Sequence, residues 1–208
     1  MAKNGTILFD IDRTLLDTDK ASLLHEEAVL KVLGTSDLEK IQSIKLNYRN
    51  TLSNEREYKA EDFLKILADE LKFNRINDLM DVYYSEKYAF TYANAVFPEV
   101  TSVLDTLSAN YNLGIYSEGA NKFQNNKFRS MNISKYFDEE IIFIVSAKDT
   151  LEVIKKIPKG SIVIDDKERI CEFLTSNGIE AIWLNNKGNR KSDNFKTIFS
   201  LLELPAIL

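Results

Sequence analysis

Residues 6–17 read TILFDIDRTLLD. The apolar run from Thr6 to Phe9 is typical of a buried β-strand, and two acids, Asp10 and Asp12, follow it directly. Both carboxylates are therefore expected at the carboxyl end of a first strand, with Thr14 just beyond them. The stretch predicts a strand that ends in a polar site.

Later parts of the chain contain four runs of similar length and composition, separated by segments with helical periodicity. They are Leu113 to Tyr116, Ile141 to Val145, Ser161 to Ile164 and Ala181 to Leu184. Strands that alternate with helices indicate the α/β fold class, with a doubly wound parallel sheet.

The pattern changes between about residues 19 and 92, where helical stripes follow one another without a strand-like run. We expect an inserted α-helical cap domain at residues 19–92 and an α/β catalytic core at residues 1–18 and 93–208. Open parallel sheets bind ligands at the carboxyl ends of their strands. An insertion after the first strand is expected to cover that edge as a lid.

Composition excludes several classes of protein. The 208 residues are 44% hydrophobic and 28% charged, as in a folded globular protein. The 32 acidic and 27 basic residues give a formal charge of −5, which argues against a nucleic-acid partner.

Localisation is predicted from the N-terminus and the apolar runs. The longest run, near Ile141 to Val145, is far shorter than the ~20 residues that span a bilayer, so no membrane segment is expected. The first ten residues, MAKNGTILFD, lack the apolar core and cleavage site of a signal peptide, and Cys171 is the single cysteine. We therefore expect a cytoplasmic protein.

The acidic pair of the first strand suits nucleophilic chemistry. Two carboxylates this close repel each other, so one must be compensated by a cation or remain protonated. That asymmetry fits a nucleophile, Asp10, beside a group that carries a proton, Asp12. By itself the pair is weak evidence, because an aspartate near a threonine also caps helices and turns.

Three further polar motifs follow predicted strands and strengthen the interpretation. They are Ser117 with Glu118-Gly119, then Lys148, then Asp165-Asp166. The first offers a hydroxyl and backbone N–H groups to a phosphoryl oxygen, and the lysine offers a positive charge. The four acids together predict a site for a hard cation such as Mg²⁺.

These motifs, in this order, resemble the haloacid dehalogenase superfamily. Its phosphatase members have an Asp-x-Asp-x-Thr motif, then a serine or threonine, a lysine and an acidic pair. The likeness covers about Lys3 to Asp17 and Ala93 to Leu184. It implies an α/β hydrolase core with an inserted helical cap, acting as a Mg²⁺-dependent phosphatase on a small phosphorylated metabolite.

The resemblance also implies roles for single residues. Asp10 would attack phosphorus and form an aspartyl phosphate, Asp12 would act as general acid and then as base, and Lys148 would pair with Asp10 and the phosphate. Thr14, Ser117, Glu118 and Gly119 would form the phosphate site. Mg²⁺ would bind Asp10, the backbone carbonyl of Asp12 and Asp166, with Asp165 behind them.

Two features depart from the family pattern. Arg13 stands where glycine is usual, so we expect the loop to carry an extra cation near the substrate. The stretch from Lys148 to Asp166 is short, which leaves Lys155 or Lys156 as an alternative lysine.

Other chemistry-bearing residues are better explained by packing or solvation. His25 is a lone helical histidine, and Cys171 lies on a predicted buried helix face without a basic partner. The basic residues of the segment 45–59 could hold a distal anionic group of a substrate, but a solvated helix face explains them more simply.

Three rival functions remain open. A dehalogenase of the same superfamily needs no acid for a departing halide, so Asp12 argues for phosphate chemistry. A phosphomutase or other phosphotransferase would share every motif and differ in how the cap closes. A non-catalytic phosphoacceptor or binding domain fits less well, because a receiver has its acceptor aspartate mid-chain.

Overall fold

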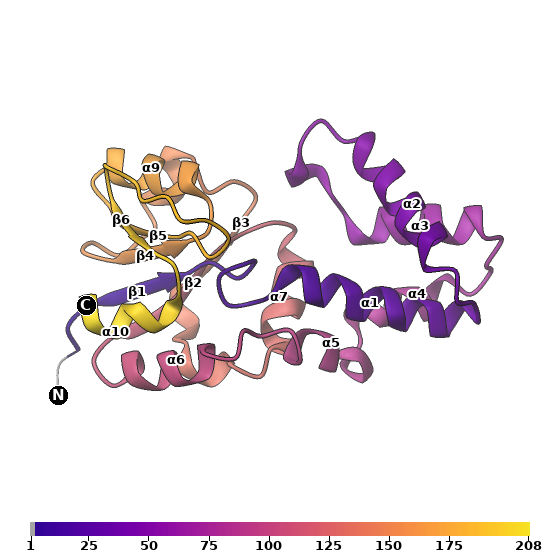
Figure 1. The fold of residues 1–208 in the computed structure, drawn as a ribbon, viewed down its shortest axis with the longest axis horizontal. Helices are drawn as coiled ribbons and strands as arrows, with labels where there is room; N and C mark the ends of the chain where they lie inside the picture. Colours follow the sequence, from indigo (N-terminus) through magenta and orange to yellow (C-terminus); the bar gives the residue numbers. More distant parts are fainter. Residues whose placement is uncertain (1–2) are drawn as a thin grey trace. The chain divides into compact units, whose positions relative to one another are not determined.

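The computed structural model describes residues 3–208. Contacts divide the chain into two compact units, one that joins the N-terminal segment up to Asp17 with Val96–Leu208, and another, Thr18–Ala95. Figure 1 traces the helices and strands along the chain.

The first unit is built on a six-stranded parallel sheet with the order β3-β2-β1-β4-β5-β6. The strands are β1 Thr6–Phe9, β2 Asn112–Glu118, β3 Ile142–Val145, β4 Ile162–Asp165, β5 Glu180–Leu184 and β6 Lys196–Ile198. This confirms the α/β fold class with a parallel sheet. The short β6 was not predicted from the sequence.

Helices cover both sides of this sheet. In Figure 1, α9 (Glu168–Ser176) lies on one side, and α6 (Val100–Ser108) and α10 (Leu204–Ile207) lie on the other. The remaining helices of this unit are α7 Asn121–Ser130 and α8 Leu151–Ile154, with 3₁₀ turns at Ser134–Tyr136, Glu139–Ile141 and Leu201–Glu203. Helices on both faces explain why the strands are apolar runs rather than alternating ones.

The apolar stripes of the sequence explain how these helices pack. In α6, the residues at spacing i, i+3, i+4 and i+7 are Val100, Val103, Leu104 and Leu107, and all four are buried. Helix α9 buries Ile170, Cys171 and Leu174 in one cluster with Leu8, Val163 and Ala181 of the sheet. The central strands are thus held from both faces.

The second unit consists of helices, as the stripes of residues 19–92 predict. They are α1 Thr18–Leu33, α2 Leu38–Asn50, α3 Ala60–Glu70, α4 Ile76–Tyr84 and α5 Phe90–Ala93, with 3₁₀ turns at Glu55–Glu57 and Glu86–Tyr88. Helix α1 contacts α2, α4 and α5, and α3 contacts α2 and α4.

The chain leaves and re-enters the first unit at one place. Leu16 forms an antiparallel bridge with Val96, and the N–H of Phe97 donates to the carbonyl of Leu15 over 3.1 Å. Both leucines are fully buried. The two connections are therefore joined inside the core. Within residues 3–208, no helix has both the length and the apolar composition to cross a membrane.

Candidate active site

The turn after β1 presents Asp10 and Asp12. The N–H groups of Thr14, Leu15 and Leu16 all converge on the carbonyl of Ile11, which wraps the chain tightly. Arg13 has a φ of 59°, in the left-handed region that favours glycine, and its carbonyl accepts a hydrogen bond from Nδ2 of Asn186. The departure from glycine seen in the sequence is thus accommodated by a strained backbone conformation.

Lys148 lies at the centre of the buried part of the site. Its Nζ is 2.5 Å from Oδ1 of Asp10 and 2.6 Å from Oδ2 of Asp165, and all three residues are at most 4% exposed. Lys155 and Lys156, the alternative lysines, are exposed. Lys148 is therefore the lysine that the structure brings to the acids.

The peptide of Lys148 is held on both sides by β2. The hydroxyl of Tyr116 donates to the Lys148 carbonyl over 2.6 Å, and the Lys148 N–H donates to Oε2 of Glu118 over 2.9 Å. Burial raises the pKa of Tyr116 well above its usual range, so its hydroxyl stays protonated as a donor. Two residues of one strand thus fix the position of this lysine.

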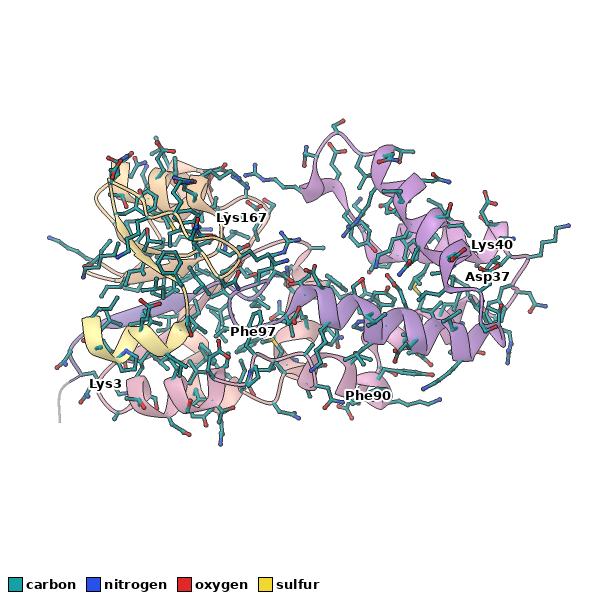
Figure 2. All side chains as sticks on the ribbon, viewed as in Figure 1. Lys3, Asp37, Lys40, Phe90, Phe97 and Lys167 are labelled. Atoms are coloured by element: carbon teal, nitrogen blue, oxygen red, sulfur yellow. The ribbon has the colours of Figure 1, made fainter. Side chains whose placement is uncertain are left out.

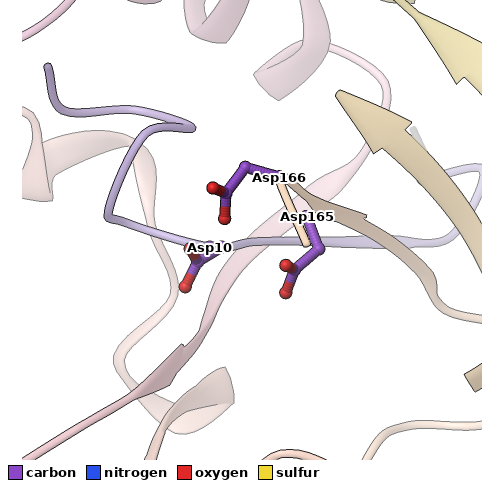
Figure 3. Close-up of side chains that lie close together, drawn as sticks. All are labelled: Asp10, Asp165 and Asp166. Carbon is purple, nitrogen blue, oxygen red and sulfur yellow. The ribbon is translucent and has the colours of Figure 1, made fainter. Parts of the chain in front are cut away.

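Three carboxylates gather at the ends of β1 and β4. Each of Asp10, Asp165 and Asp166 offers an oxygen within 4.8 Å of the others (Figure 3). Asp165 uses one oxygen for Lys148 and the other for the N–H of Lys167, the residue labelled in Figure 2. Oδ1 of Asp166 is buried without a hydrogen-bond partner among the described residues.

Two acids of this cluster, Asp10 and Asp166, resist ionisation. Burial raises the pKa of Asp10 from an ordinary 3.8 to about 6. Burial and the charges of Asp10 and Asp165 raise the pKa of Asp166 from 3.8 to about 7. Lys148 opposes the shift of both acids. Burial alone would lower the pKa of Lys148, but the charges of Asp10 and Asp165 outweigh it and raise that pKa.

This donor set fits a hard divalent cation. Mg²⁺ and Ca²⁺ take carboxylate oxygens as ligands, and a buried carboxylate oxygen without a donor is favourable only when a positive charge compensates it. Oδ1 of Asp166 is such an atom. The residues present therefore suit the magnesium ion that the sequence predicts.

The carboxylate of Asp12 belongs to a different set of contacts. Nζ of Lys127 is 2.7 Å from both of its oxygens, and Nε2 of Gln124 is 2.9 Å from Oδ2. The resemblance implies that a cation would bind the backbone carbonyl of Asp12 and not this carboxylate, which these two side chains hold. Asp12 is more accessible than Asp10, with a side chain 28% exposed.

Two hydroxyls of the predicted phosphate site are buried and unsatisfied. Oγ of Ser117 and Oγ1 of Thr14 have no hydrogen-bond partner within residues 3–208. Such groups are costly unless a ligand or water binds them. They are the donors that the site can offer to a phosphoryl oxygen.

Two residues of the predicted phosphate site, Gly119 and Glu118, make contacts within the protein. The N–H of Gly119 donates to the carbonyl of Val145 over 2.9 Å, so it continues the sheet instead of facing a ligand. The carboxylate of Glu118 accepts from Lys148 and lies 3.6 Å from Nζ of Lys167 and 3.5 Å from a guanidinium nitrogen of Arg169. Sequence reasoning could not see that sheet pairing extends past Ser117.

Two of the residues set aside in the sequence analysis, His25 and Cys171, pack in the interior. His25 is 3% exposed, and its ring nitrogens contact the carbonyl of Ala21 and the hydroxyl of Thr91. Cys171 is buried, and burial raises the pKa of its thiol. Neither residue is placed as a reactive group.

Lys127 and Gln124 were missed by the sequence interpretation. The available signal was a lysine and a glutamine three residues apart on the helix that follows the Ser117 strand. A polar pair on the inner face of such a helix indicates a charged partner inside.

Comparison with known proteins gives one family. The chain matches the model of "Haloacid dehalogenase-like hydrolase" over residues 7–160. No curated protein matches the chain.

Several solved structures share the fold. A HAD-hydrolase, YfnB, from Bacillus subtilis bound to magnesium has a TM-score of 0.66 at 19% identity, with 99% of this chain and 98% of that chain covered. A 2-haloacid dehalogenase from Pseudomonas syringae has a TM-score of 0.64 at 19% identity, with 100% and 98% covered. A HAD phosphatase from Thermococcus onnurineus has a TM-score of 0.59 at 22% identity, with 98% and 97% covered. At these identities the likeness shows the fold.

Proposed function

This chain belongs to the haloacid dehalogenase-like hydrolases, and from that premise we propose that it is a Mg²⁺-dependent phosphomonoesterase acting on a small phosphorylated metabolite. The observation that carries the proposal is the buried cluster of Asp10, Asp165 and Asp166, in which one lysine pairs with two of the three acids. A site of this kind needs further positive charge before it can accept an anionic phosphate.

Asp10 is the proposed nucleophile. One of its carboxylate oxygens forms a bond to phosphorus as the bond from phosphorus to the leaving oxygen breaks, which gives an aspartyl phosphate. Lys148, in contact with Oδ1 of Asp10, holds that carboxylate in place and adds positive charge beside the reacting group. When bound, Mg²⁺ supplies charge compensation and polarises a phosphoryl oxygen.

Asp12 is the proposed proton carrier in both steps. In the first it gives its proton to the leaving oxygen, and in the second it takes a proton from the water that attacks phosphorus. The second step releases inorganic phosphate and restores the Asp10 carboxylate. Ser117 and Thr14 donate their unsatisfied hydroxyls to phosphoryl oxygens.

The contrast with dehalogenation supports phosphate as the substrate group. A halide leaves without a proton, so a carboxylate at Asp12 has no task in that reaction. Here two side chains of α7 are committed to holding this carboxylate. The Pseudomonas syringae 2-haloacid dehalogenase is similar in fold. The release screen below therefore also measures halide released from 2-haloacids.

We also propose that Thr18–Ala95 acts as the cap. The chain enters this unit six residues after Asp12 and returns at Val96, beside the same turn. Insertion at this point is what a substrate-selecting lid requires.

The deciding experiment is a release screen with the full chain. We expect inorganic phosphate from p-nitrophenyl phosphate and from several sugar or nucleoside monophosphates, with Mg²⁺ and not with excess chelator. The Asp10→Asn variant should remain folded and lose more activity than the ~10²- to 10⁴-fold typical of lost acid–base help. After acid quench, Asp12→Ala should carry a hydroxylamine-sensitive phosphoryl group on the peptide that contains Asp10.

Other outcomes would contradict the proposal. Halide release from 2-haloacids without phosphate release would identify a dehalogenase. Transfer of the phosphoryl group to a second hydroxyl of the substrate, without free phosphate, would identify a phosphomutase.

A further inference from the structure

Helix α7 holds the carboxylate of Asp12 from the protein side. Lys127 donates to both oxygens at 2.7 Å, and Gln124 donates to Oδ2 at 2.9 Å. The lysine side chain is 6% exposed, whereas that of Asp12 is 28% exposed. One side of the carboxylate is thus clamped while part of it stays accessible.

The clamp is itself held in place. Nε2 of Gln124 also donates to the carbonyl of Glu118 over 3.0 Å, so both protons of its amide nitrogen are used. Gly119 has a φ of 150°, and a Cβ there would come within 2.9 Å of the same Nε2. The end of β2 is therefore shaped to seat Gln124.

Lys127 has a second contact that fixes its ammonium group. Its Nζ lies 4.9 Å from the centroid of the Phe123 ring, one turn earlier in α7. With Phe123 on one side and Asp12 on the other, this lysine has little freedom to reorient.

Stability alone does not explain this arrangement. Burying a lysine costs desolvation energy that its ion pair barely repays, and an apolar side chain of similar volume is often as stable or more so. Methionine would satisfy α7 as a packing residue, but it could not orient a carboxylate. The value of Lys127 is in what it does to Asp12.

We infer that Lys127 is a positioning residue for Asp12: with Gln124, it fixes the carboxylate so that its accessible part meets the leaving oxygen and then the water. This inference rests on the proposed function, in which Asp12 carries the proton. A general acid or base must lie within hydrogen-bond reach of the group it serves. A freely rotating Asp12 would spend much of its time in other rotamers.

The kinetic test compares three variants of α7. Lys127→Met should lower kcat on a phosphomonoester about 10²-fold, the lower end of what losing acid–base help costs, with KM little changed. Lys127→Arg should recover much of that loss, because a guanidinium also donates to both oxygens of a carboxylate. Lys122→Met, at an exposed lysine of the same helix, is the matched control and should behave as the wild type.

A double-mutant cycle separates positioning from a general structural effect. If Lys127 acts through Asp12, adding Lys127→Met to Asp12→Asn should cost little further kcat. A further loss of the full 10²-fold in the Asp12→Asn background would overturn the inference. So would an unchanged kcat in Lys127→Met, if Asp12→Asn lowers kcat. Either result would leave the proposed function standing.

An NMR arm judges the contact without turnover. In protein with ¹⁵N-labelled lysine, a protected Nζ signal that is absent in Lys127→Met should shift in Asp12→Asn and stay unchanged in Asp37→Asn. An unchanged signal in Asp12→Asn would overturn the inference. Absence of phosphate release by the wild-type chain on every monoester would instead overturn the proposed function.

Discussion

Among residues 3–208, each unit has a buried ionic cluster, and the charges of the two clusters balance differently. In the helical unit, Glu26 accepts from Lys45 at 2.7 Å, from Gln42 at 3.0 Å and from Ser22 at 3.1 Å. In the sheet unit, Lys148 serves Asp10 and Asp165, and Asp166 lies beside them. The first cluster has one lysine for one acid, and the second has one lysine for three.

The pKa values follow this difference. Burial acts to raise the pKa of Glu26, but the hydrogen bonds and charge of Lys45 and the bond from Gln42 outweigh it, so the pKa falls below its ordinary value. Burial and neighbouring acids instead raise the pKa values of Asp10 and Asp166. A self-compensated cluster stabilises its own unit, whereas an uncompensated one is prepared for a ligand that brings positive charge.

Removing the lysine of each cluster should give the largest contrast. Lys148→Met leaves buried acids without a counter-charge, so we expect a loss of about 3–5 kcal/mol in the free energy of unfolding and no phosphate release. Lys45→Met leaves two donors on Glu26 and should cost about 1–2 kcal/mol with turnover retained. Urea unfolding and phosphate release measure the two effects. Equal losses of stability and activity in both variants would refute the contrast.

The direction in which the free energy of unfolding changes with pH should follow the direction of each pKa shift. In the unfolded chain, Asp10 and Asp166 lose their protons near the ordinary value of 3.8, but in the fold only near 6 and 7. Between these values the native state binds more protons. In chelator, the free energy of unfolding should therefore fall by about 6 kcal/mol from these two groups together as pH rises from about 4 to about 7.

Two comparisons isolate that fall. The double variant Asp10→Asn/Asp166→Asn should not show it in urea unfolding at the same pH values. Glu26 should behave oppositely, because its contribution is present above its ordinary value of 4.5 and is lost as pH falls through its lowered pKa. A fall of the same size in the double variant would show that other groups cause it.

Neutralising one acid in each cluster should have small effects of opposite sign. At pH 7.5 in chelator, Asp166→Asn should gain about 1–2 kcal/mol of unfolding free energy because an unfavourable buried charge is removed. Glu26→Gln should lose about 1 kcal/mol because its donors prefer a charged acceptor. Destabilisation by Asp166→Asn in chelator would contradict the prediction.

Mg²⁺ at 100 times its Kd should stabilise the wild type by about 2.7 kcal/mol and Asp166→Asn far less.

Much of the fold and part of the site follow from local patterns in the sequence. Runs such as Thr6 to Phe9 and Ser161 to Ile164 are apolar enough to indicate buried strands, and parallel strands bring their polar ends to one edge. That rule groups Asp10 with Asp165, whereas the choice of Lys148 over Lys155 and Lys156 needs the assembled fold. Lys196–Ile198 escaped prediction because three residues give no periodicity.

The contacts of Asp12 could not be predicted in the same way. They depend on which face of α7 turns inward, and its buried residues are Gln124, Lys127 and Phe128, of which only one is apolar. A helix face that is buried through polar and ionic contacts leaves no apolar stripe, so hydrophobic periodicity does not predict it. Likewise, the use of the Gly119 N–H depends on the register of β2 against β3, which only the assembled sheet sets.

The bridge between Leu16 and Val96 has a consequence for how such a protein can evolve. Because the core itself brings these two residues together, the whole segment between them acts as a surface loop whose two ends are already held together. The entropy of closing such a loop grows only with the logarithm of its length, by about 0.6 kcal/mol for each doubling. Helices can therefore be added, shortened or exchanged there without altering any strand. One catalytic framework can thus acquire a new substrate range by replacing a single contiguous segment of its gene.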